Sequence, residues 1–133
     1  MKTLPLAAAL SCLATLAQAD TPVLTVMTYD SFASEWGPGP QIEKGFEATC
    51  GCDVRFVTAG DGAALLARVQ LEGAQSDGDV VLGLDTNLTA AATASGLFAP
   101  HGQPAVTGLP VVWDDPLFLP FDWGWFAFVY DKT

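Results

Sequence analysis

Three short apolar runs alternate with helix-like segments, and this alternation limits the possible folds more than any other feature. The runs are VLTVMTY at 23–29, DVRFVT at 53–58 and DVVLGL at 79–84. Short runs that are rich in β-branched residues and nearly continuous in apolar character are typical of strands covered on both faces. Strands that alternate with helices predict a parallel sheet with helices packed on its faces. The sequence therefore predicts an α/β fold.

The segments between these runs carry helix signals, namely apolar residues one turn apart and a proline or glycine at one end. The expected helices begin near Pro40 with Ile42 and Phe46 on one face, run from 62 to 72 with Leu65, Leu66 and Val69 on one face, and run from 87 to 95. Beyond 117 the pattern changes, because LFLPFDWGWFAFVY at 117–130 is crowded with aromatic residues and has no helical period. This segment is predicted to be strand-like, with a turn or bulge near Asp122 and Gly124.

Residues 1–19 have the pattern of a targeting segment. Lys2 supplies a positive start, and residues 4–17 form an apolar stretch too short to span a bilayer comfortably. Ala17 and Ala19 provide small residues at the two positions that a signal peptidase reads. We therefore expect a signal peptide at 1–19, cleavage after Ala19, and an exported product without stable membrane insertion.

Charge and cysteine content limit the range of possible functions. The chain has 5 basic and 15 acidic residues and a net charge of -10, which argues against nucleic acid as a partner. In an oxidising compartment the pair Cys50 and Cys52 suggests a disulfide, with reduced thiols as the alternative. A disulfide across so short a loop requires Gly51 to turn the backbone. His101 is the single histidine and is expected in a solvated loop. No metal site and no catalytic set are predicted from these residues.

Ligands of open parallel sheets bind beyond the carboxyl ends of the strands. The segments expected at that edge are 29–36, 60–62 and 84–87. Asp61 suits the N-cap of the following helix, and Gly62 allows a close approach to backbone N–H groups, which favour anions at a helix start. This edge is the expected ligand-binding site.

Several blocks carry a more specific signal: LTVMTYDSFASEWGPGP, the Cys-x-Cys pair, GDGAALLARVQLEG, DVVLGLDTNLTAAA, GLFAPHG and FDWGWFAFVYDK. In order and spacing they resemble the thiamine-binding subunits of bacterial ABC importers, and more distantly the ferric-iron-binding proteins. The resemblance implies a type II periplasmic binding protein with two lobes. Residues 20–133 would then form the N-terminal lobe, truncated near the hinge, with the second lobe largely absent.

The resemblance also implies a function. The protein would capture thiamine, thiamine monophosphate and thiamine diphosphate in the periplasm and deliver them to a membrane permease and its ATPase. These compounds would be ligands, and neither a cofactor nor catalysis is expected. Asp61 and Gly62 match the family's thiamine-contacting pair. Tyr29 and Trp36 are the aromatic candidates for stacking on the cationic ligand, with packing inside the lobe as the alternative for each.

Two other functions remain open. An exported thiamine-processing enzyme on the same scaffold would need a nucleophile, most naturally a cysteine, in the cleft. Cys50 and Cys52 are instead expected at the edge of the sheet opposite Asp61. The other alternative is a binding protein for another small solute, such as ferric iron.

Overall fold

The computed structural model describes residues 20–125 and 127–132. The expected signal peptide at 1–19, with its cleavage site after Ala19, lies outside the described residues. Among those described, a three-stranded parallel sheet has the order β2-β1-β3. Its strands are β1 (Val23–Thr28), β2 (Asp53–Thr58) and β3 (Val80–Leu82). The predicted parallel α/β arrangement is confirmed.

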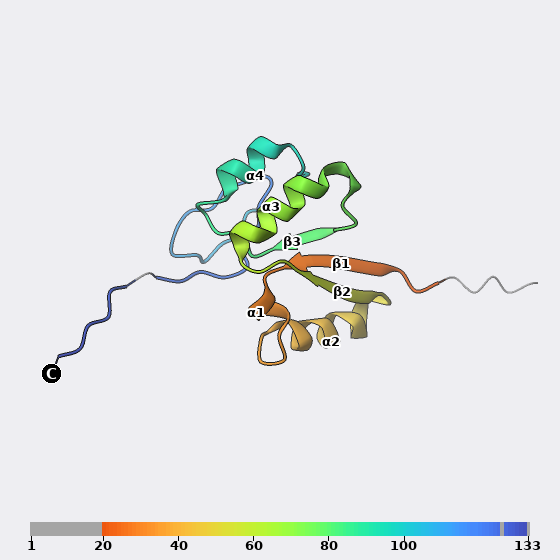
Figure 1. The fold of residues 1–133 in the computed structure, drawn as a ribbon, viewed down its shortest axis with the longest axis horizontal. Helices are drawn as coiled ribbons and strands as arrows, with labels where there is room; N and C mark the ends of the chain where they lie inside the picture. The colour runs from red at the N-terminus through yellow and green to blue at the C-terminus, as the bar shows by residue number, and fades with distance from the viewer. Residues whose placement is uncertain (1–19, 126, 133) are drawn as a thin grey trace, which may run out of the picture.

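Helices cover both faces of the sheet (Figure 1). They are α1 (Asp30–Ala33), α2 (Gly39–Cys50), α3 (Gly62–Glu72) with the 3-10 turn η1 (Gly73–Gln75), and α4 (Thr89–Ser95). Figure 1 shows α1 and α2 on one side of the sheet and α3 and α4 on the other. The three predicted helices are confirmed, whereas α1 lies in a stretch that the sequence did not mark as helical.

The core has one part on each face of the sheet. On the α3 side, Met27 of β1 packs with Leu65 and Val69, which are residues of the predicted apolar face. On the other side Phe32 of α1 is 0% exposed and contacts the ring of Phe56 at a centroid distance of 5.7 Å. Side chains alternate between the faces of β1, so this central strand contributes to both halves.

The apolar face predicted for α2 is covered less than expected. Ile42 and Phe46 remain 41% and 47% exposed. By contrast the carboxylate of Glu47 on the same helix is half-buried, and its Oε1 accepts the N–H of Val54 at 2.8 Å. Because β2 is an edge strand of the described sheet, α2 has no further strand beneath its outer flank.

The prediction for 117–130 is wrong in the described part of that segment, which excludes residue 126. No strand or bridge is formed there, and the chain runs out from the body of the fold (Figure 1). A strand is stabilised by the hydrogen bonds of a neighbour, and neither β2 nor β3 pairs with this segment. The first part of this segment still packs on the fold, since the ring of Phe121 contacts that of Phe32 at a centroid distance of 5.6 Å.

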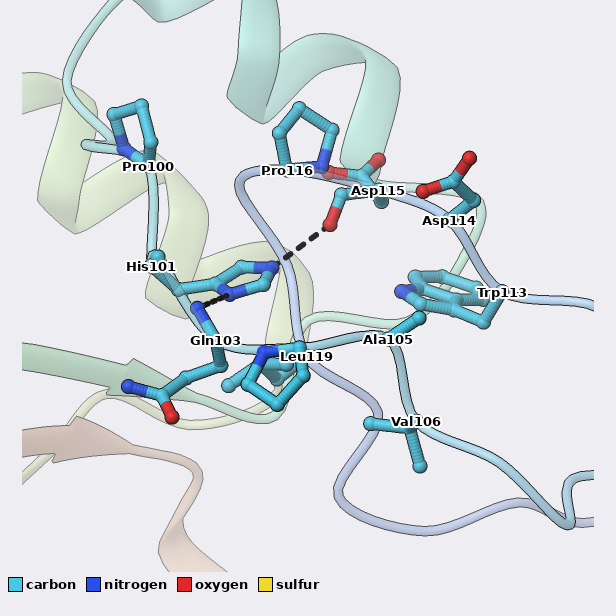
Figure 2. A pocket seen from close by; sticks show the side chains of 12 residues that line it. Pro100, His101, Gln103, Ala105, Val106, Trp113, Asp114, Asp115, Pro116 and Leu119 are labelled. Carbon is cyan, nitrogen blue, oxygen red and sulfur yellow. Dashed lines mark hydrogen bonds between the residues drawn. The ribbon is translucent and has the colours of Figure 1, made fainter.

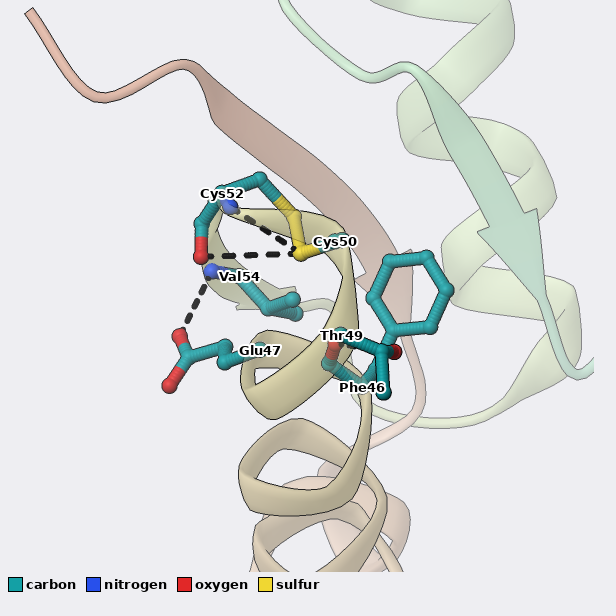
Figure 3. The surroundings of a disulfide bond; sticks show 6 residues. All are labelled: Phe46, Glu47, Thr49, Cys50, Cys52 and Val54. Atoms are coloured by element: carbon teal, nitrogen blue, oxygen red, sulfur yellow. Dashed lines mark hydrogen bonds between the residues drawn. A yellow bond between two sulfur atoms is a disulfide. The ribbon is translucent and has the colours of Figure 1, made fainter.

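Cys50 and Cys52 are joined by a disulfide at the end of α2 (Figure 3). Gly51 between them has φ 64°, the left-handed conformation that ends the helix and turns the chain back. The Cys52 N–H points to the Cys50 sulfur at 3.1 Å. The bend that so short a loop requires is therefore provided by glycine.

We expect this bond to be present in the purified protein and to contribute little to stability. A loop of three residues removes little chain entropy from the unfolded state, so Cys50→Ser should cost less than about 2 kcal/mol. Intact mass after alkylation, with and without prior reduction, tests the pairing. Alkylation of both cysteines without reduction would show that the thiols are free.

Candidate functional site

The loops that follow β1 and β2 are joined at the carboxyl edge of the sheet. Asp30 donates its N–H to the carbonyl of Gly60 at 2.8 Å, and Asp30 Oδ1 accepts the N–H of Gly60 at 2.9 Å. Both residues lie two positions beyond the paired ends of their strands, Thr28 and Thr58. The reciprocal pair therefore continues the register of the sheet into the two loops.

Asp61 caps α3, as the sequence predicts. Its Oδ1 accepts the N–H of Ala64 at 2.9 Å, and its carbonyl accepts the N–H of Leu65 at 2.8 Å. The residue is exposed, so its carboxylate faces solvent while it caps the helix. One side chain can in this way stabilise the helix and present negative charge at the edge of the sheet.

Gly62 packs against the loop that follows β3. A Cβ at this position would lie 2.7 Å from the carbonyl oxygen of Gly83, a distance that real Cβ atoms do not adopt. The start of α3 therefore approaches the loop after β3 because residue 62 has no side chain. This packing by itself requires a glycine at position 62, whether or not an anion also contacts its N–H group.

Gly83 in turn lies against one edge of the Tyr29 ring. It has φ 110°, and a Cβ there would collide with the ring, approaching Cε1 to 2.6 Å. The half-buried ring of Tyr29 also contacts Phe32 edge-on, with centroids 5.7 Å apart and planes at 67°. The structure thus brings Tyr29, Gly83 and Gly62 together in a row across the carboxyl ends of three strands.

Trp36 is placed differently. It lies in the loop between α1 and α2 and is 81% exposed, so packing within the described residues does not account for it. The two predicted aromatic residues therefore differ, because Tyr29 is partly held by its neighbours whereas Trp36 presents its ring to solvent.

Arg68 ties α3 to the same edge of the sheet. Its Nη1 donates to the carbonyl of Thr58 at 3.0 Å, and its Nε contacts Glu72 Oε1 at 2.6 Å. The hydrogen bond from Arg68, followed by one from Ser76, lowers the pKa of the Glu72 carboxyl below its ordinary value. The charged form of Glu72 is therefore favoured, and the ion pair holds Arg68 over the end of β2.

Cys50 and Cys52 lie away from this site. Cys52 directly precedes β2, and Asp61 follows the opposite end of the strand, as the sequence predicts. Both sulfurs are also occupied by the disulfide. In residues 20–125 and 127–132, no group of three or more His, Cys, Asp and Glu side chains is arranged to hold a metal ion.

A separate hollow of about 270 Å³ lies in the segment after α4 (Figure 2). His101 forms part of its wall, and the expectation of a solvated loop histidine is wrong because the residue is half-buried. Its Nδ1 accepts the N–H of Gln103 at 3.0 Å, which leaves Nε2 to donate to the carbonyl of Asp115 at 2.9 Å. Tyr29, Trp36, Asp61 and Gly62 do not line this hollow.

Two residues of the edge were not identified from the sequence. Gly83 had a weak signal, namely a glycine inside a run otherwise read as strand, which often marks a close approach of backbone or side chain. Asp30 had none, since a carboxylate that accepts a backbone N–H from a residue 30 positions away is visible only in the fold.

Comparison with known proteins gives a consistent set of relatives, although no family model matches the chain. A thiamine-binding periplasmic protein of Escherichia coli (strain K12) is 55% identical over 113 residues, covering 84% of this chain and 35% of the relative. A protein of the same name from Haemophilus influenzae (strain ATCC 51907 / DSM 11121 / KW20 / Rd) is 46% identical over 127 residues, or 94% of this chain and 38% of the relative.

A solved structure titled periplasmic thiamin binding protein superimposes with a TM-score of 0.72 at 50% identity, covering 77% of this chain and 32% of that one. The α/β arrangement described above therefore matches part of a periplasmic binding protein fold. In sequence and in fold the chain is similar to the thiamine-binding periplasmic proteins, and it spans about a third of the length of the curated relatives that it matches.

Proposed function

We propose that the intact protein is a periplasmic solute-binding protein that captures thiamine, thiamine monophosphate and thiamine diphosphate. It would pass them to the permease and ATPase of an ABC importer. The observation that carries this proposal is the 46–55% identity, over most of the chain, to proteins named for thiamine binding in the periplasm. Those relatives are named as binding proteins, which favours binding over catalysis.

The carboxyl edge of the sheet has groups that suit such a ligand. Thiamine carries a cationic thiazolium ring, and a cation over an aromatic face gains roughly 0.5–2 kcal/mol. Tyr29 and Trp36 are the aromatic residues that we assign to this contact. The carboxylate of Asp61 would add attraction for the cation from the exposed start of α3.

The phosphate esters would meet the N-terminus of α3. Asp61 uses the N–H groups of Ala64 and Leu65, so a bound phosphate would have to meet those of Gly62 and Ala63. This division lets the acid cap the helix while the first N–H groups face the anion. Thiamine would be cargo in this site and the protein would need no cofactor.

Fluorescence titration of the intact protein with thiamine tests the proposal. We expect saturable quenching of tryptophan emission and no chemical change in the recovered thiamine. Absence of binding would contradict a thiamine receptor, and turnover would favour the alternative of an exported thiamine-processing enzyme. Binding of ferric iron in place of thiamine would favour the other alternative.

Asp61→Asn separates the two roles of this residue in the same titration. Asparagine is as good an N-cap as aspartate, so the melting temperature should hold. If the negative charge contacts the cation, thiamine affinity should fall by roughly 1–2 kcal/mol, the scale of a charge-assisted contact. Affinity equal to that of the parent protein would leave Asp61 as a helix cap alone.

A further inference from the structure

We propose that Asp30 is a positioning residue for the ligand site, and that its carboxylate holds the Asp61-Gly62 turn in place against Tyr29. This inference rests on the proposed function, because it concerns the same site. It assigns a role to a residue that directly follows Tyr29 and that need not touch the ligand.

The contact is a two-point connection between loops that are far apart in sequence. The Asp30 N–H donates to the Gly60 carbonyl at 2.8 Å and Asp30 Oδ1 accepts the Gly60 N–H at 2.9 Å. Just before it, the Ala59 N–H donates to the carbonyl of Thr28 at 3.1 Å. The backbone ladder between β1 and β2 is thereby extended by a side chain at the point where the strands have ended.

The two hydrogen bonds matter because Gly60 lies in the turn at the start of α3. It has φ 69°, a conformation open mainly to glycine, and it directly precedes Asp61 and the first turn of α3. A turn of this kind has few intrinsic constraints. Two hydrogen bonds to Asp30 fix where the helix starts relative to the loop that carries Tyr29.

The same edge is closed on its other side by packing. Gly62 lies against Gly83, and Gly83 lies against the edge of the Tyr29 ring. Together with the bonds between Asp30 and Gly60, these contacts connect Tyr29, Asp61 and Gly62 in a closed ring. Without the Asp30 carboxylate, Gly60 is held to this loop by the backbone bond from the Asp30 N–H alone, so the spacing between Asp61 and Tyr29 is less tightly fixed.

Asp79 offers a matched control on the opposite edge of the sheet. Its Oδ2 accepts the N–H of Thr25 at 2.8 Å and its own N–H donates to the Thr25 carbonyl at 2.9 Å. Like Asp30, it is an exposed carboxylate that extends a ladder of β1 in a reciprocal pair. It does so at the start of β3, at the end of the sheet opposite the predicted site.

The experiment compares Asp30→Ala, Asp30→Asn and Asp79→Ala in the intact protein. We expect Asp30→Ala to weaken thiamine binding about tenfold, the equivalent of one lost hydrogen bond to a charged group. Asp30→Asn keeps an oxygen that can accept the Gly60 N–H and should restore affinity to near the parent value. Asp79→Ala should lower the melting temperature as much as Asp30→Ala while leaving affinity unchanged.

Amide hydrogen exchange without ligand gives a second readout. The N–H groups of Gly60 and Ala64 should exchange faster in Asp30→Ala and at the parent rate in Asp79→Ala. Equal affinity losses in Asp30→Ala and Asp79→Ala would reduce the effect to general destabilisation and overturn the positioning role. Equal losses in Asp30→Ala and Asp30→Asn would show a direct charge contact instead.

The proposed function and the role of Asp30 can be overturned separately. A parent protein that does not bind thiamine overturns the proposed function. A parent protein that binds thiamine, with Asp30→Ala binding equally well, overturns only the role of Asp30.

Discussion

Gly83→Ala is expected to weaken thiamine binding roughly tenfold and to destabilise the intact protein by about 1–3 kcal/mol. The stability loss comes from φ 110°, which a residue with a Cβ rarely adopts. The affinity loss comes from the ring of Tyr29, which the new methyl group would displace. A displaced ring loses its stacking on a cation, worth roughly 0.5–2 kcal/mol. Calorimetric titration and thermal unfolding measure the two effects.

Gly96→Ala is the control for backbone strain. Gly96 also has positive φ, 67°, but a Cβ there would meet no atom within 4 Å. It should therefore lose stability without losing affinity. The double variant Gly83→Ala/Tyr29→Ala tests the collision itself, since removing the ring should make its stability loss smaller than the sum of the single losses. Additive losses would show that the ring and the glycine are independent.

Phe32→Ala is expected to give the largest loss of stability, about 3–5 kcal/mol. Phe32 is fully buried, and its ring contacts those of Tyr29, Phe56 and Phe121 at centroid distances of 5.7, 5.7 and 5.6 Å. Truncation would leave a cavity where α1, β2 and the segment after 117 meet. Urea unfolding followed by circular dichroism measures the loss.

Leu71→Ala is the matched exposed substitution. Leu71 lies on α3 and is 88% exposed, so its truncation should change stability by less than about 0.5 kcal/mol. Phe32→Leu should fall between the two, because it keeps most of the buried volume and loses the ring contacts. A loss below about 1 kcal/mol for Phe32→Ala would mean that this aromatic cluster does not hold the lobe together.

Local patterns in the sequence predicted the central part of the fold. The run at 53–58 and the helix at 62–72 match β2 and α3 in their bounds. Both have strong signals, respectively a β-branched apolar run and an apolar stripe with an N-cap and a terminal glycine. The third strand was expected at 79–84 and is limited to Val80–Leu82. The flanking residues make other contacts, since the Asp79 side chain accepts the N–H of Thr25 and Gly83 lies against the edge of the Tyr29 ring.

The sequence was less informative where stability depends on a neighbour. Aromatic content at 117–130 indicated a strand, but no described strand edge pairs with it. The apolar spacing of Ile42 and Phe46 indicated a buried face, but the edge position of β2 leaves both half exposed. Composition and periodicity describe what a segment can bury, and they do not say whether the rest of the fold supplies the surface.

The sequence by itself therefore determined the order of the three strands and of α2, α3 and α4, the cap at Asp61 and the three loops at the carboxyl edge, because each depends on residues close together in the chain. Only the tertiary structure decided how those loops meet. Residues that are distant in sequence meet there: Asp30 pairs with Gly60, Gly62 packs on Gly83, and Gly83 packs against the edge of the Tyr29 ring. These residues lie close together because the parallel register of the sheet places the carboxyl ends of all three strands side by side.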